Sequence, residues 1–152
     1  MPKIDIDKVP IDTASGYPAQ FNKIIQGRSR KRLGNAVGLD QFGVNLCTLK
    51  PGSASSQRHW QHNEDEFVYV LQGEVVLCED GGETILKPGD AAGWKAGVPN
   101  GHCLINRSQN DVVFIEVGTR APSEKVTYPD IDMAFERVGT TRKYSKKSGE
   151  PY

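Results

Sequence analysis

Turn-forming residues recur every 7 to 12 positions along residues 42–117, and short runs of strand-forming residues lie between them. The runs cover residues 42–49, 66–71, 75–79, 83–87, 91–95, 102–106 and 112–117. No amphipathic helical stretch separates them, which argues against an alternation of strands and helices. This spacing predicts an all-β barrel or sandwich.

The chain has 152 residues, the length of one domain, and its 19 Lys and Arg balance its 19 Asp and Glu. Zero net charge argues against a general nucleic-acid or membrane-surface binder. The basic run Arg28–Arg32 is interpreted as a solvated loop, with a phosphate-binding patch as the alternative. Three cysteines without paired spacing fit a reducing compartment. With no apolar signal segment near the N-terminus, they predict a cytoplasmic protein.

Histidines and carboxylates are the residues best suited to chemistry. His59 and His62 lie close to the acidic cluster 64–66, and His102 is the third and last histidine. Imidazole and carboxylate together are typical ligands of Zn, Fe(II), Mn or Ni. In a strand, even offsets share a face, so His59 lies with Gln61 and His62 lies with Glu66. A bulge would be needed for His59 and His62 to reach one ion.

Two segments carry a family resemblance. The segment 51–73, PGSASSQRHWQHNEDEFVYVLQG, resembles the first motif of the cupin superfamily, with Glu66 six residues before Gly73. The segment from His102 to Asn106 resembles the second motif, and PGD at 88–90 and NGH at 100–102 also look like that family. YPDID at 128–132 and the terminal GEPY extend the likeness to a bacterial group of small single-domain cupins, mostly of unassigned function.

The resemblance implies an all-β fold, a double-stranded β-helix or jelly-roll barrel. We expect the barrel at residues 41–120, an irregular N-terminal extension at 1–40 that packs on it, and an irregular C-terminal extension at 121–152. A helical turn is predicted within 132–138. Cupins commonly self-associate through their sheets, so the resemblance also implies a homodimer.

The metal ligands implied by the resemblance are His59, Glu66 and His102, with Gln61 or His62 in the place of the second histidine of the first motif. We prefer the register that places Gln61 there, because it shares a face with His59. The alternative is that His62 turns inward through a bulge. The implied cofactor is one divalent metal ion, Zn, Fe, Mn or Ni.

The implied function is a metal-dependent enzyme acting on a small polar metabolite, with dioxygenase, isomerase and lyase chemistry left open. The alternative is a non-catalytic module that binds a small molecule. Glu64 is a candidate general base, although a solvent-facing role is favoured for it. Cys103 alternates with His102 and is expected to face away from the cavity, and Asn106 is expected to support the site rather than bind metal.

Overall fold

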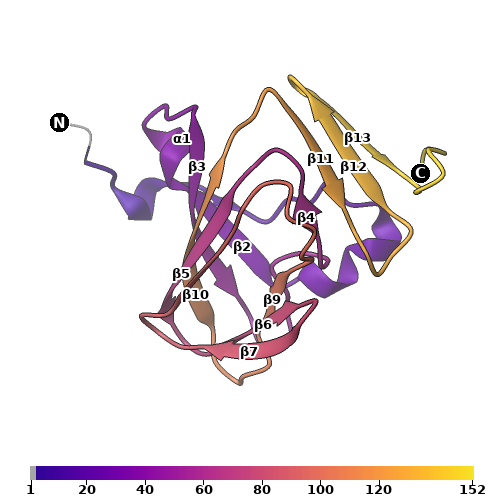
Figure 1. Ribbon diagram of the computed structural model, residues 1–152. Helices are drawn as coiled ribbons and strands as arrows, with labels where there is room; N and C mark the ends of the chain where they lie inside the picture. The colour runs from indigo at the N-terminus through magenta and orange to yellow at the C-terminus, as the bar shows by residue number, and fades with distance from the viewer. Residues whose placement is uncertain (1–2) are drawn as a thin grey trace.

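The computed structural model describes residues 3–152 and folds into three antiparallel sheets (Figure 1). All seven predicted runs form strands within one or two residues of the expected bounds, so the all-β prediction is confirmed. The six-stranded sheet has the order β1 (Ile11–Asp12), β2 (Arg28–Arg32), β3 (Phe42–Leu49), β10 (Val112–Thr119), β5 (Glu66–Gln72) and β8 (Ala91–Trp94).

Two smaller sheets complete the fold. One has the order β7 (Gly82–Leu86), β6 (Val75–Glu79), β9 (Cys103–Ile105). The other has the order β13 (Thr141–Ser145), β12 (Ala134–Val138), β11 (Ser123–Thr127), β4 (Trp60–Gln61). The short helix α1 spans Leu33–Ala36, and 3-10 turns lie at Ile6–Lys8, Ala19–Phe21 and Lys23–Ile25.

The inward positions of the large sheet change from apolar to polar along its central strands β3, β10 and β5. On β10 the sequence of inward residues runs from Val112 and Phe114, both buried, to Glu116. On β5 it runs from the buried Val70 and Val68 to Glu66. The apolar ends form the main core, which comprises Cys47, Leu49, Val68, Val70, Val75, Leu77, Leu86, Leu104, Val112 and Phe114. The polar ends lie beyond this core, and they form one wall of a cavity.

The basic run 28–32 is not the solvated loop that its charge suggests. It forms β2, which pairs with β3 in the register Arg30 to Cys47. The even-numbered arginines face the polar cavity rather than the apolar core. For this reason a strand in the interior of the sheet can carry three charged side chains on one face. Strand pairing here satisfies the backbone groups and overrides the local composition.

The predicted helical turn within 132–138 is also wrong. Residues Ala134–Val138 form β12, which pairs with β11 and β13. Met133 and Phe135 are buried in a second apolar cluster with Val126 and Tyr128. A strand alternates its faces and so buries Phe135 while it leaves Glu136 exposed.

Within residues 3–152 no helix has the length and apolar character needed to cross a membrane.

Candidate metal centre

Two histidines that are far apart in sequence face each other across an isolated antiparallel bridge. The backbone N–H of His102 donates to the carbonyl of His59 at 2.8 Å, and the reciprocal bond measures 3.1 Å. Their imidazole rings lie on the same side, with centroids 4.9 Å apart. Both residues are buried, with 9% and 3% of their surface exposed.

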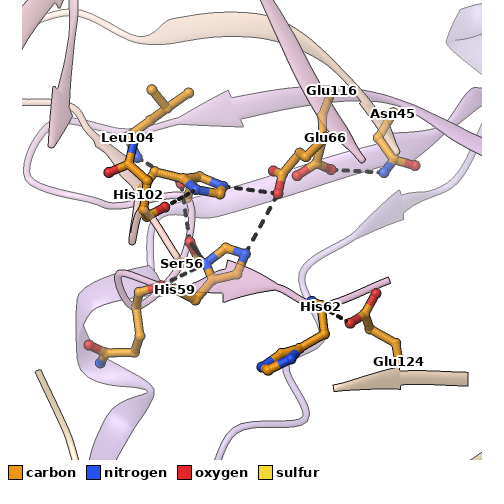
Figure 2. Close-up of polar contacts among 12 residues, drawn as sticks. Asn45, Ser56, His59, His62, Glu66, His102, Leu104, Glu116 and Glu124 are labelled. Atoms are coloured by element: carbon orange, nitrogen blue, oxygen red, sulfur yellow. Dashed lines mark hydrogen bonds and ion pairs between the residues drawn. The ribbon is translucent and has the colours of Figure 1, made fainter. Parts of the chain in front are cut away.

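Glu66, the first residue of β5, brings a carboxylate between the two imidazoles (Figure 2). Its Oε2 lies 3.1 Å from Nε2 of His102 and 3.6 Å from Nε2 of His59. One ligand atom from each of these three residues lies within 4.8 Å of the others. Three converging donors of this kind form a group that can hold a divalent metal ion.

The other ring nitrogens are held by the backbone. Nδ1 of His59 lies 3.0 Å from the carbonyl of Gln57, and Nδ1 of His102 lies 3.2 Å from that of Asn100. When Nδ1 donates to a carbonyl, the lone pair of a neutral imidazole is on Nε2, which faces the centre. The backbone therefore orients both rings for metal ligation.

The electrostatics of the group couple its charges. Burial acts to raise the pKa of Glu66, but the hydrogen bonds to His102 and His59 outweigh it and lower that pKa well below its ordinary value. Burial acts to lower the pKa of His59, but the carboxylate of Glu66 outweighs it and raises that pKa. The site thus keeps its carboxylate ionised, the form that binds a cation.

The side chains of Gln61, the last residue of β4, and of His62, which follows it, point to opposite sides of the chain. Gln61 lines the same cavity as His59, and its Oε1 is buried with no hydrogen-bond partner. His62 instead stacks on Trp60, with ring centroids 4.0 Å apart, and its Nε2 lies 3.0 Å from Oγ1 of Thr127. Regular alternation is kept through this segment, so no bulge turns His62 inward. Gln61 therefore remains the candidate fourth ligand, because a buried oxygen without a partner fits a cation.

The acidic cluster 64–66 disperses its charges in three directions. Glu64 pairs with Arg137 and accepts the N–H of Ala121 at 2.9 Å. Burial raises the pKa of Glu64. Asp65 accepts the N–H of Ala96 at 2.8 Å, so only Glu66 reaches the histidines. Glu64 lines the cavity rather than facing solvent, but its carboxylate is occupied by these partners.

The cavity beside the metal group has a volume of about 500 Å³ and lies between the six-stranded and the four-stranded sheets. That volume is in the range of small-molecule sites. Its polar lining includes Arg28, Arg30, Arg32, Asn45, His59, Gln61, Glu64, Glu66, Glu116, Glu124 and Arg137. A lining this rich in charge fits a polar, charged ligand.

Sequence reasoning missed Glu116 and Asn45. Glu116 Oε2 accepts a hydrogen bond from Nδ2 of Asn45 at 2.9 Å (Figure 2). The signal was present, because Glu116 follows Val112 and Phe114 at even offsets in a strand that is otherwise mostly apolar. A carboxylate on the inward face of such a strand needs a polar partner or a cavity.

Trp94 supports the site from outside, whereas Asn106 holds a loop and contacts none of the three metal-group residues. Trp94 stacks on His102, with centroids 3.8 Å apart and planes 5° apart, and its Nε1 donates to Glu79. Asn106 is fully buried, and its Nδ2 donates to the carbonyls of Leu49 and Asn110. These bonds hold the loop after β9, so Asn106 is structural.

The thiols give a first testable expectation. Burial raises the pKa of Cys103 to about 12 and that of Cys47 further, while Cys78 is less buried. Since the thiolate is the reactive form, iodoacetamide at mildly alkaline pH should modify Cys78 first and leave Cys47 and Cys103 largely unmodified. Peptide mass spectrometry measures this order, and the same labelling in denaturant is the control. Fast native labelling of Cys103 would contradict the burial described here.

Known proteins share this architecture. A family model for the cupin domain matches residues 45–118. A crystal structure of a sugar phosphate isomerase of the cupin superfamily from Silicibacter pomeroyi is 44% identical, with a TM-score of 0.96 over 99% of this chain and 96% of that one. A proposed sugar phosphate isomerase from Acidithiobacillus ferrooxidans is 29% identical, with a TM-score of 0.76 over 84% and 82% of the two chains. No curated protein sequence matches this chain.

A more distant likeness concerns the fold alone. A polyketide cyclase from Streptomyces resistomycificus has a TM-score of 0.69 at 19% identity, over 86% of this chain and 87% of that one.

Proposed function

This chain belongs to the cupin superfamily, and we propose that it is a metal-dependent isomerase that acts on a phosphorylated sugar. The observation that carries the proposal is the buried group His59, Glu66 and His102 beside a cavity lined with arginines and carboxylates. Two similar proteins bear on the reaction: the one from Silicibacter pomeroyi is named a sugar phosphate isomerase, and the one from Acidithiobacillus ferrooxidans is a proposed one. Their descriptions support the reaction class.

The residues fit a divalent cation. His59, Glu66 and His102 would hold it, and the buried Oε1 of Gln61 would provide a fourth, weaker donor. A divalent ion bound there would supply Lewis acidity, which would polarise a carbonyl or hydroxyl oxygen of the substrate. The group combines nitrogen and oxygen donors, which suit Zn, Fe, Mn and Ni.

Isomerisation of an aldose to a ketose needs a group that moves a proton. The proton leaves the carbon next to the carbonyl and is returned to the carbonyl carbon, while a hydroxyl proton moves between the two oxygens. Glu116 is suited to this role, because Glu66 pairs with Gly118 and Glu116 is its diagonal neighbour on the same face. Such neighbours are about 7–8 Å apart at the backbone.

Other carboxylates of the cavity are less available. Glu64 is paired with Arg137, and Glu124 accepts backbone N–H groups of His62 and Asn63. Glu116 holds Asn45 and the thiol of Cys47 through Oε2 alone, which leaves Oε1 for a substrate proton. We therefore assign proton transfer to Glu116.

The test is an isomerase assay over aldose phosphates of five and six carbons, with Mn, Zn, Fe(II) or Ni added in turn. We expect metal-dependent interconversion and, in heavy water, deuterium incorporation next to the carbonyl. Glu116→Gln should lower kcat by at least about a hundredfold, which is typical for the loss of a general base. Glu74→Gln, at an exposed turn, is the matched control and should keep full activity.

A non-catalytic binding module remains the second candidate, and Gln61 favours it. A glutamine stands where the cupin motif resembled here has a histidine, and an amide oxygen binds these metals more weakly than an imidazole. For a module, sugar phosphates would raise the melting temperature without any turnover or deuterium exchange. That outcome would refute the isomerase.

The homodimer, the cytoplasmic location and the absence of nucleic-acid and membrane partners stay predictions. An exposed apolar stripe on the outer face of β5 supports the homodimer, and it consists of Phe67, Tyr69 and Leu71.

A further inference from the structure

Alternate arginines of β2 face the cavity. Arg28, Arg30 and Arg32 line it, whereas Lys31 lies on the other face and donates to the carbonyl of Ile6. Two of the arginines have partners. Arg32 pairs with Asp12 at 2.6 Å, and Nη1 of Arg28 donates to the carbonyl of Ser55 at 2.6 Å.

Arg30 differs from its neighbours. Its Nε is buried and has no hydrogen-bond partner, and its guanidinium forms no ion pair with any residue from 3 to 152. A buried donor without a partner costs free energy, and the cost is larger for a charged group. The protein therefore carries a fixed cation at the cavity wall whose counter-ion does not come from the described chain.

Arg28 adds a second positive charge to the same wall. Its guanidinium is bonded to backbone carbonyls, which leave its charge uncompensated. Burial lowers the pKa of Arg28, and the charge of Arg30 lowers it further. No acid of residues 3–152 forms an ion pair with Arg28 or Arg30: Asp12 pairs with Arg32, and Glu116 acts on Arg28 only through space while its Oε2 accepts from Asn45. Two like charges held together in this way favour an anion between them.

We propose that Arg28 and Arg30 bind the phosphate group of the substrate, an inference that rests on the proposed function and deepens it. A phosphate monoester carries a charge of about −1.5 to −2 at neutral pH. It therefore balances the charge of two guanidinium groups better than a ligand with a single carboxylate would. The planar guanidinium also donates two parallel hydrogen bonds to phosphate oxygens.

The position of the pair suits a substrate that spans the cavity. β2 and β5 are separated by β3 and β10, so these two strands lie about 14 Å apart across the sheet. The pairing places Arg30 level with Val70, four residues along β5 from Glu66. Side chains that extend into the cavity from both strands shorten this distance. The phosphate would thus be held at one end, with the reacting carbons near Glu66 and Glu116.

The test is calorimetric titration of inorganic phosphate into the protein as purified, repeated after treatment with a chelator. The chelator arm removes phosphate binding through a metal ion. We expect wild-type protein to bind phosphate in both arms and Arg30→Gln to bind at least about tenfold more weakly, the loss expected for one charge-assisted contact. Lys31→Gln is the matched control, because it removes the same charge from the opposite face, and its affinity should not change.

Two further variants guard against a folding defect. Arg30→Lys keeps the charge without the planar fork and should bind phosphate with intermediate affinity. Arg30→Gln should not melt below wild type without phosphate, since it removes an uncompensated charge, but it should lose the rise in melting temperature that phosphate causes. Equal phosphate affinity in Arg30→Gln and wild type, or no binding by wild type after chelation, would overturn the proposal.

The outcomes also separate this inference from the isomerase. Phosphate binding that depends on Arg30, without any isomerisation, would support the phosphate site and contradict the proposed reaction. Isomerisation by Arg30→Gln with an unchanged KM for phosphorylated sugars would support the proposed reaction and contradict the phosphate site.

Discussion

Replacing His102 or His59 with alanine is expected to empty the metal centre. Each substitution removes one of three converging donors, and the remaining two with the amide of Gln61 form a much weaker site. Bound metal should fall from about one ion per chain to below a tenth of that, and turnover should fall with it. Metal analysis of the purified proteins by mass spectrometry measures the change.

The matched control is His62→Ala. Its imidazole stacks on Trp60 and contacts Thr127, outside the metal group, so this variant should keep its metal. Circular dichroism establishes that all three variants are folded. Equal metal content in His59→Ala, His102→Ala and wild type would rule out the site.

Proton competition gives the same centre a pH dependence. Burial acts to lower the pKa of His59, yet Glu66 raises it above its ordinary value. Metal binds the deprotonated imidazole, so affinity for metal should fall as the pH drops through this raised pKa and recover above it.

The second large effect concerns stability. Gly73→Ala should destabilise the fold by about 2–5 kcal/mol, because two costs add at this turn. Gly73 has a φ of +78°, where a Cβ is strained, and an added Cβ would lie 2.6 Å from the carbonyl oxygen of Asp111. Such a loss is a large part of a typical unfolding free energy. Urea denaturation measures it.

Gly52→Ala separates the two costs. Gly52 has a φ of +83°, but nothing lies within 4 Å of an added Cβ. This control should therefore lose only the conformational part, about 1–2 kcal/mol. If Gly73→Ala and Gly52→Ala lose the same stability, the close approach of Asp111 to the β5–β6 turn is not as described.

The sequence by itself determined the barrel strands between residues 42 and 119 and the nature of the metal group. Turn spacing located β3 and β5 to β10, because Gly and Pro interrupt backbone pairing wherever they cluster. The motif likeness singled out His59, Glu66 and His102. Alternation along the chain also placed Gln61, rather than His62, with His59. These are local properties, which short-range sequence patterns encode.

Only the tertiary structure decided what surrounds that group. Whether the arginines of β2 are solvated or line a cavity depends on the pairing of β2 with β3, and nothing in residues 28–32 specifies that partner. The position of Glu116 beside Glu66 likewise depends on the register between β10 and β5. Contacts between strands distant in sequence are set by the packing of the whole chain, so local pattern cannot supply them.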